Sequence, residues 1–523
     1  MTTRITPRRA LAVLAAAGVF VAACSSGESA LTSGEDEPEA TEAPAQTEAP
    51  TGSDAGDSDG EPADEPEATD APAETEAPTT TVAPLAEFPP CPVDALDAAD
   101  GPVDVLFWHS MTNELETALI GLTDEYNASQ DRVRVELQNQ TSYESTIDKY
   151  IQSSQGSRPT LVQLPEYTLQ SFAESGTAIP VQACIEAAGF DTSALLQRTT
   201  DAYTFEGVQW SMPFNVSNPV LYYNRKMFVE AGLDPEDPPI SLEDMRDVSQ
   251  QLVDSGAATY GWVVDSGTDS GGAWFLEQWF GRAGELYSDN GNGRLAPSTE
   301  VLFDSATGVE LLTFVQEMID DGLAFTVGDN PGGLDAFLKL ADENEPGAMT
   351  IGTSAGLGTV IAALGSGIAP DLGPDDVGVG PMPGPGDQPA AQVGGASLWL
   401  VAEKDDAATA AAWDYVQFLV NAQSQSTWAA ATGYAPIRSD ALDLDPLATQ
   451  YAEDPRFRVP YDQLTTSVDD VAASAPVLGP QREVRDATAN AIAAIFTGAD
   501  VATALADAAD EANALIRSYN DRN

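Results

Sequence analysis

The chain has 523 residues, of which 43% are hydrophobic, and its formal net charge at pH 7 is −61. This charge argues against a nucleic-acid partner, because binding to phosphate backbones needs clustered cations. Repulsion from anionic lipid likewise argues against a peripheral membrane-binding surface. The hydrophobic content is that of an ordinary folded protein, and the length is enough for two lobes with separate cores.

The first residues have the order of a bacterial export signal. Arg4, Arg8 and Arg9 precede an apolar run over residues 10–23, which is too short to span a bilayer of about 30 Å. Small residues then lead directly into Cys24, an arrangement that resembles a lipobox. We therefore predict a lipoprotein signal peptide at 1–23 and lipidation of Cys24. The alternative is an ordinary signal peptide followed by an incidental cysteine.

Residues 24–90 read as the lipidated cysteine followed by a disordered tether. The segment consists mainly of Glu, Asp, Ala, Pro, Thr, Ser and Gly, and no Lys or Arg occurs between Arg9 and Arg132. Such a segment has too little apolar surface to offset the entropy of ordering it. We expect it to hold a folded domain at 91–523 away from the membrane. An acidic tail that binds a basic partner is the alternative.

Cys91 and Cys184 remain once Cys24 is assigned to the anchor. Two cysteines in an exported domain allow one disulfide, and two separate thiols are the other possibility. Neither cysteine has a histidine nearby in the sequence, so we expect no metal site there.

The first half of the domain alternates strands and helices. Apolar spacing predicts strands at 103–108, 133–137 and 160–164, and helices at 113–126, 144–153 and near 167–174. This alternation predicts a parallel sheet whose ligand lies beyond the carboxyl ends of the strands. The loops expected there are Trp108–Ser110, Gln140–Tyr143 and Pro165–Tyr167.

The second half reads as more helical. A strand at 220–224 precedes a helix at 225–231, and Ser241 opens another helix as its N-cap. A mostly helical block is then expected to about residue 345. Returning strands are predicted at 348–351 and 396–401, and helices at 406–419, 480–496 and 501–519.

Several short motifs stand in a fixed order along the domain. They are FWHSM at Phe107–Met111, PFN at Pro213–Asn215, LYYN at Leu221–Asn224, FVEAGLDP at Phe228–Pro235, GGASLW at Gly394–Trp399 and TGYAPI at Thr432–Ile437. In this order they resemble the extracellular solute-binding proteins of ABC importers. Within that superfamily the chain most resembles the sn-glycerol-3-phosphate-binding proteins.

The resemblance implies a two-lobed α/β fold of the periplasmic-binding-protein type, with the ligand in a cleft between lobes that close on it. We place one lobe near 101–214 plus 350–402 and the other near 219–345 plus 406–523. It also implies a monomer outside the cytoplasm that delivers a small molecule to ABC permease subunits, with a separate ATPase. No cofactor or metal is expected.

The resemblance further implies a set of ligand-binding residues, each matched to a family motif. They are Tyr143, Glu166, Ser217, Thr353 with Ser354 beside it, Gly395, Tyr434 and Arg485. Arg485 would offer a planar fork of donors to a phosphate, and the hydroxyls and the Gly395 amide would add neutral donors. Glu166 would repel phosphate, so we expect it at the opposite end, accepting from glycerol hydroxyls.

One position departs from the family pattern. Where relatives often have a tryptophan that stacks under glycerol, the match falls on Ser270 or Gly271. A small residue leaves room for a larger head group, so a glycerophosphodiester such as glycerophosphocholine becomes a candidate beside sn-glycerol-3-phosphate. A choline group would need an aromatic face, for which Trp274, Trp279 and Trp108 are available.

Two other functions remain as alternatives. In the same fold, the chain could be an oligosaccharide receptor with Trp274 and Trp279 as stacking platforms. A secreted serine hydrolase is the remote alternative, because GTSAG at Gly352–Gly356 matches a nucleophile elbow around Ser354. That elbow needs a histidine later in the chain, whereas the single histidine, His109, lies upstream.

Overall fold

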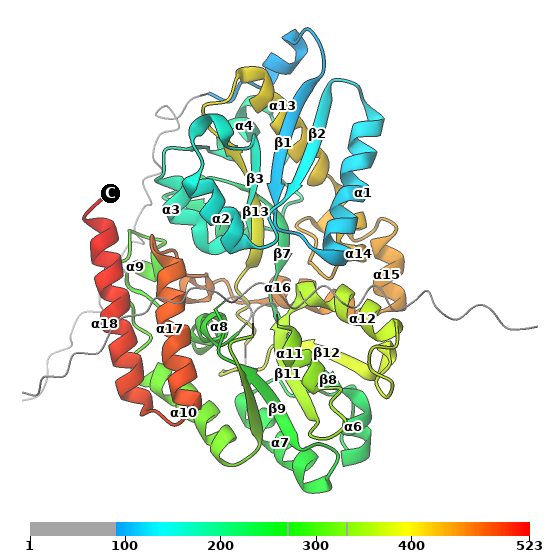
Figure 1. The fold of residues 1–523 in the computed structure, drawn as a ribbon, viewed down its shortest axis with the longest axis vertical. Coiled ribbons are helices and arrows are strands. Elements are labelled where there is room, and N and C mark those ends of the chain that lie inside the picture. The colour runs from blue at the N-terminus through cyan, green and yellow to red at the C-terminus, as the bar shows by residue number, and fades with distance from the viewer. Residues whose placement is uncertain (1–89, 269–270, 331–332, 387) are drawn as a thin grey trace, which may run out of the picture. The chain divides into compact units, whose positions relative to one another are not determined.

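The computed structural model describes residues 90–268, 271–330, 333–386 and 388–523, which form two α/β lobes (Figure 1). The predicted signal peptide, Cys24 and the tether as far as residue 89 lie outside the described residues. Within the described ranges, no helix is both long enough and apolar enough to cross a membrane.

The first lobe is built on a mixed sheet with strand order β2-β1-β3-β13-β4, to which β7 is added through β13. As the sequence predicted, β1 is parallel to β2 and β3; β13 runs antiparallel to β3, β4 and β7. The strands are β1 (Val103–His109), β2 (Val133–Asn139), β3 (Leu161–Pro165), β4 (Ala178–Ile179), β7 (Met212–Ser217) and β13 (Gly394–Val401).

Helices pack on this sheet through apolar stripes. The helix predicted at 113–126 buries Leu119, Leu122 and Tyr126 in the core of the lobe. The helices are α1 (Asn113–Ser129), α2 (Tyr143–Gln152), α3 (Leu169–Ala173), α4 (Val181–Ala188), α5 (Gln197–Ala202), α13 (Asp406–Leu419) and α14 (Ala422–Ala431), and a small hairpin joins β5 (Thr204–Phe205) to β6 (Val208–Gln209).

The second lobe has its own sheet, with strand order β10-β9-β11-β8-β12. Its strands are β8 (Pro219–Asn224), β9 (Tyr260–Asp265), β10 (Ala324–Gly328), β11 (Gly347–Thr353) and β12 (Val377–Pro381). Its helices, together with those of the return segment, are α6 (Arg225–Ala231), α7 (Leu242–Ser255), α8 (Gly272–Ala283), α9 (Asp289–Asn292), α10 (Ala306–Asp320), α11 (Leu334–Lys339), α12 (Leu357–Gly365), α15 (Leu447–Glu453), α16 (Val459–Thr466), α17 (Gln481–Phe496) and α18 (Val501–Asn520). Ser241 caps α7 in a full capping box with Asp244, as its position predicted.

The predicted lobe boundaries are wrong in two places. Residues 350–402 were assigned to the first lobe, but β11 pairs with β8 and β9, and β12 pairs with β8, so this stretch belongs to the second sheet until β13. Residues 406–523 were assigned to the second lobe, but α13 and α14 bury Trp413 and Trp428 in the first core. Strand pairing between distant segments decides the first placement and helix packing in the first core decides the second. Neither can be read from the local sequence pattern.

The block expected to be mostly helical also contains β9 and β10. The β9 sequence YGWVVD is buried along almost its whole length, so it lacks the alternation that marks a half-exposed strand. β12, with the sequence VGVGP, was missed as well, because glycine and proline have low strand propensity.

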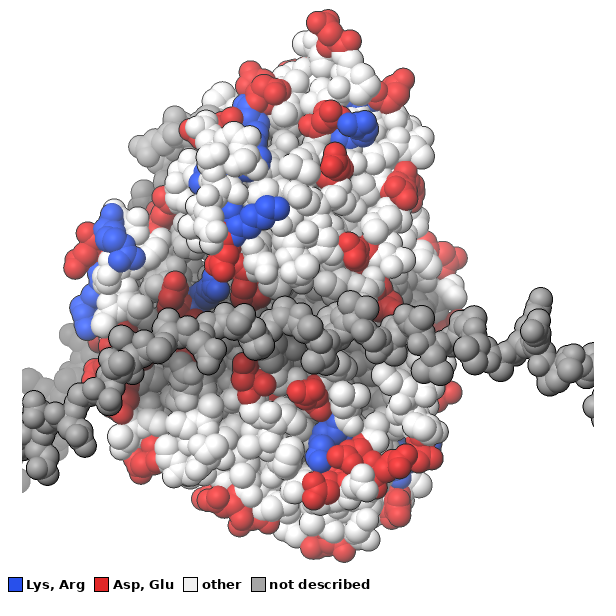
Figure 2. All heavy atoms as spheres, in the orientation of Figure 1, with Lys and Arg blue, Asp and Glu red and all other residues white. Residues whose placement is uncertain are grey.

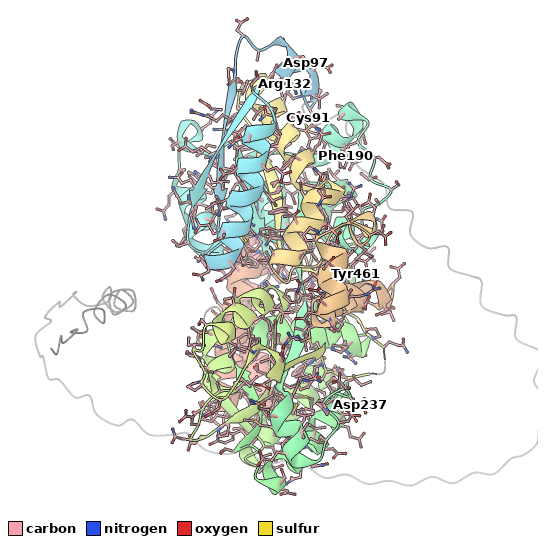
Figure 3. The ribbon with its side chains drawn as sticks, turned by 90° about the vertical axis from the view of Figure 1, so that its right-hand side faces the viewer. Cys91, Asp97, Arg132, Phe190, Asp237 and Tyr461 are labelled. Atoms are coloured by element: carbon pink, nitrogen blue, oxygen red, sulfur yellow. A yellow bond between two sulfur atoms is a disulfide. The ribbon has the colours of Figure 1, made fainter. Side chains whose placement is uncertain are left out.

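A disulfide joins Cys91 to Cys184, with their Cα atoms 4.9 Å apart. It links the start of the domain to α4. Figure 3 shows Cys91 near Asp97 and Arg132, at the end of the first lobe remote from Asp237. Arg132 forms an ion pair with Asp97 there, with 2.8 Å between Nη1 and Oδ1.

Acidic side chains are spread over the visible faces of both lobes, and basic ones are few (Figure 2). The excess of acidic residues in the sequence is therefore found on the folded surface as well as in the segment before the domain.

Candidate functional site

A cavity of ≈ 690 Å³ lies between the lobes, and residues of both lobes line it. The loops after β1, β2 and β3 contribute Ser110, Tyr143 and Glu166, so the predicted carboxyl edge of the first sheet faces this space. Eight of the nine candidate ligand residues line the cavity: Tyr143, Glu166, Ser217, Thr353, Gly395, Tyr434, Arg485 and Trp274.

Ser354, the ninth candidate, does not line the cavity. It is 1% exposed, and its hydroxyl accepts a hydrogen bond from the Asn218 amide at 3.4 Å. The neighbouring Thr353 lines the cavity and caps the following turn by accepting from the Ala355 amide. Of the two adjacent hydroxyls, the structure therefore presents only that of Thr353 to a ligand.

A buried chain of hydrogen bonds orients Tyr143 in the first-lobe wall. The Gln163 side chain accepts from the Ser110 amide at 2.9 Å and donates to Asn215 Oδ1 at 2.7 Å. Asn215 in turn donates to the Tyr143 hydroxyl at 2.9 Å. Burial raises the pKa of Tyr143 and that of Tyr434. Both hydroxyls therefore stay protonated at neutral pH and can donate to a ligand.

Gly395 lies where β13 passes closest to β7. Its φ is +91°, and a Cβ added there would lie 2.0 Å from the carbonyl oxygen of Asn215. Both facts require glycine at this position. Gly394 pairs with Ser217 in the same ladder, so the backbone of β13 and the Ser217 side chain reach the cavity together.

Arg485 is held by two carboxylates, one from each lobe. Its Nε and Nη2 donate to Glu277 at 2.8 and 2.7 Å, and the same Nη2 donates to Glu166 at 3.0 Å. The guanidinium carbon also lies 5.0 Å from the centre of the Tyr167 ring. The expectation that Glu166 and Arg485 mark opposite ends of the ligand is therefore wrong, because the fold brings β3 and α17 together at one place.

The charges around the cavity are mostly negative. Glu144, Glu166 and Asp329 line it together with Arg485. Burial raises the pKa of Glu166, although Arg485 opposes that rise. At the cavity margin, burial raises the pKa of Asp265 to about 7, although the Gly267 amide donates to its carboxylate at 2.9 Å. A ligand with several negative charges would meet repulsion here.

The three tryptophans considered for stacking have different environments. Trp274 lines the cavity, but Trp279 lies in the second-lobe core and donates to the Pro383 carbonyl at 2.9 Å. Trp108 lies in a first-lobe core under Lys149. Only Trp274 of the three is placed to meet a ligand.

The small residue at the expected stacking position has a local structural reason. Ser270 lies outside the described residues. A Cβ on Gly271 would lie 1.5 Å from Asp265 Oδ1, so the packing of this loop requires glycine. Gly271 does not line the cavity, so its small size does not make room for a larger head group.

Sequence reasoning missed Glu277, which is the strongest partner of Arg485. It lies in α8 within the sequence GAWFLEQWFG, among buried aromatic residues, and its side chain is 1% exposed. A single carboxylate in so apolar a stretch was a signal that a buried cation would face it.

The residues of the hydrolase alternative do not come together. Ser354 follows β11 in the second lobe, whereas His109 ends β1 in the first lobe and is 1% exposed. Neither lines the cavity. In the ranges that the structure describes, no group of His, Cys, Asp and Glu is arranged to hold a metal ion.

Comparison with known proteins places the chain among binding proteins. The model of the bacterial extracellular solute-binding protein family matches residues 121–459. The sn-glycerol-3-phosphate-binding periplasmic protein UgpB of Pectobacterium atrosepticum is 27% identical over 437 residues, which cover 80% of this chain and 93% of that protein.

Solved structures show the same fold. UgpB of Mycobacterium tuberculosis, crystallised with glycerophosphocholine, has a TM-score of 0.65 at 21% identity, over 80% of this chain and 99% of that one. The GacH receptor of Streptomyces glaucescens, solved unliganded and with acarbose, has a TM-score of 0.65 at 18% identity, over 80% and 100%. Glycerophosphocholine and acarbose are the ligands of these two solved proteins.

Proposed function

This chain belongs to the bacterial extracellular solute-binding protein family, and on that basis we propose that it captures a glycerol phosphate ester in the cleft between its lobes. Members of this family are binding components of ABC importers and work outside the cytoplasm, so the hydrolase interpretation is wrong. The proposed ligand is sn-glycerol-3-phosphate or a glycerophosphodiester such as glycerophosphocholine.

One observation carries this proposal. Side chains and a backbone amide suited to phosphate come from five separated segments to the same cavity: Ser217, Thr353, Gly395, Tyr434 and Arg485. Neutral hydroxyls and a planar guanidinium are the donors that a phosphate ester requires. The identity to glycerol-3-phosphate-binding relatives supports the same ligand class.

The proposal includes how the receptor is held and what it serves. We propose that Cys24 carries lipid on the outer face of the cell membrane and that the acidic segment after it tethers a monomeric domain. The loaded receptor would deliver its ligand to permease subunits driven by a separate ATPase. The acidic surface fits such a role, because the lipid and not the surface would supply membrane affinity.

An oligosaccharide receptor is the second candidate. The cavity of ≈ 690 Å³ is large for a glycerol phosphate, and Tyr167, Trp274 and Phe337 offer aromatic faces along it. Aromatic rings flanking a cleft suit the apolar faces of sugar rings.

A ligand panel on residues 25–523 separates the two candidates. A ligand at a hundred times its dissociation constant adds about 2.7 kcal/mol to the free energy of unfolding. We expect the thermal midpoint to rise with glycerol-3-phosphate or glycerophosphocholine and not with maltose. In Arg485→Ala the response to phosphate esters should disappear, while Trp274→Ala should keep part of it.

The unliganded midpoint of each variant is recorded first, because Arg485→Ala also leaves Glu277 buried without its cation. A response to maltose alone, lost in Trp274→Ala and kept in Arg485→Ala, would contradict the phosphate ester and establish the sugar receptor.

A further inference from the structure

Glu277 is buried behind the cavity and forms two hydrogen bonds to Arg485. We propose that Glu277 is a positioning residue: it fixes the Arg485 guanidinium in the cavity wall and lowers the net charge there, so that the cleft discriminates against doubly charged esters. This inference rests on the proposed function and names the preferred class within it, namely phosphodiesters with a neutral or cationic head group.

The contact between Glu277 and Arg485 fixes the guanidinium by its geometry. Both Glu277 oxygens engage the guanidinium edge, at Nε and Nη2, and such a two-point contact fixes the plane as well as the position. Glu277 and Arg485 lie on α8 and α17, long helices packed in the second-lobe core. Gln392 binds the backbone carbonyl of Glu277 at 3.1 Å, which ties this turn of α8 to the segment before β13.

The aromatic surroundings restrict the guanidinium further. The Tyr167 ring lies against it, and the Tyr287 hydroxyl is bonded to Thr488 on the same face of α17. The side chains of Arg485 and Glu277 are 3% and 1% exposed. An arginine so enclosed cannot swing toward a ligand, so the direction of its donors is set before binding.

The charged groups around Arg485 sum to a negative charge. One guanidinium faces two carboxylates, Glu277 and Glu166, so the cluster carries a formal charge of −1 when both are ionised. A phosphomonoester is close to doubly charged above its second pKa of about 6, whereas a diester carries one charge. The monoester therefore meets about twice the repulsion, and a cationic head group would gain from Glu144 and Asp329 nearby.

The test compares two ligands on residues 25–523, the chain without its predicted signal peptide and the cysteine proposed to carry lipid. Dissociation constants for glycerol-3-phosphate and glycerophosphocholine are measured by titration calorimetry at pH 8, in the wild type and in Glu277→Gln. We expect the wild type to bind the diester more tightly, and the preference to fall about tenfold in E277Q, since one buried negative charge is removed from the cavity wall. Glu310→Gln, which removes an exposed carboxylate from the same lobe, should leave the preference unchanged.

The ratio of the two dissociation constants separates a failure of the Glu277 inference from a failure of the proposed function. A purely structural role would weaken both ligands equally, so an unchanged ratio in E277Q overturns this inference while the proposed function stands. If the wild type binds neither ester, both fail. Should E277Q not fold, Glu277→Asp keeps the charge and withdraws the carboxylate. It should then weaken both esters at least tenfold and keep their ratio, and unaltered affinities would overturn the positioning role. Because a structural role would also keep the ratio, the wild-type ratio is measured at about pH 5 as well, where the monoester carries close to one charge. A preference for the diester that does not fall there would overturn the charge discrimination.

Discussion

At the scale of single residues, burial decides how the acidic groups near the cleft behave. Asp265 ends β9, is 5% exposed, and accepts from the Gly267 amide and the Asn330 side chain. These bonds favour its ionised form, but desolvation outweighs them and raises the pKa to about 7. The residue therefore changes charge near neutral pH, under the loops at the margin of the cavity.

This shift predicts how stability depends on pH. Asp265 binds a proton more tightly in the folded chain than in the unfolded one, so between about pH 4 and pH 7 stability falls as pH rises. Asp265→Asn removes the titration. We expect the variant to gain on the wild type as pH rises, by up to about 4 kcal/mol at pH 8, because each pKa unit corresponds to about 1.4 kcal/mol.

Denaturant unfolding at pH 4.5, 6 and 8 measures this difference. Asp237→Asn, an exposed carboxylate in the second lobe (Figure 3), is the matched control and should follow the wild type at every pH. Curves for D265N and wild type that stay parallel across the range would contradict the prediction.

At the scale of elements, the pairing of β13 with β7 places part of the cavity wall. The register shifts between Ala396 and Ser397, directly after the glycine pair. Such a bulge turns the strand, and here it lets the Gly395 backbone reach the cavity that Ser217 also lines. The close approach of Asn215 links this turn to the hydrogen bonds that hold Tyr143.

Gly395→Ala should disturb both stability and the site. A left-handed alanine costs about 1–2 kcal/mol, and the clash with Asn215 adds to this by pushing the strands apart. Gly367→Ala is the control, because Gly367 has φ +80° but nothing within 4 Å of an added Cβ. We expect G395A to lose at least twice as much free energy of unfolding as G367A, and to bind its ligand more weakly. Equal losses would show that the close approach does not matter.

At the scale of the whole molecule, the described chain crosses between two lobes whose facing surfaces share charged contacts. Glu166 of the first lobe reaches Arg485 of the second. Away from the cavity, Arg294 of the second lobe donates to the carbonyls of Asp201 and Thr204 in the first. The contact between Glu166 and Arg485 is an ion pair between two side chains that line the cavity. The contact of Arg294 is made with backbone carbonyls, away from that cavity.

The proposed anchor is also a property of the whole molecule. In a bacterium that lipidates exported proteins, the full-length chain should fractionate with the membrane, and Cys24→Ala should move it to the soluble extracytoplasmic fraction. The reason is that the acidic chain offers no other attraction to anionic lipid. Ser25→Ala should stay with the membrane. Immunoblots of the fractions measure this, and an unchanged distribution of C24A would contradict the anchor.

The sequence by itself determined the local structure where one face of an element is buried. The helices at 225–231 and 406–419 were predicted to the residue, because caps and apolar stripes are written within a few positions. The order of the motifs was enough to indicate the family, and eight of the nine ligand residues proposed from it line the cavity. Buried strands such as β9 could not be predicted in this way, since their pattern resembles that of a buried helix.

Tertiary structure alone decided how distant segments combine. It placed β11 in the second sheet and α13 in the first lobe, and it brought Glu166 and Glu277 to the same guanidinium. The physical reason is that strand pairing and the neutralisation of buried charge depend on neighbours far apart in the chain. The apolar stretch around Glu277 indicates that a buried cation will face it, but nothing in the sequence identifies that cation as an arginine 208 positions away.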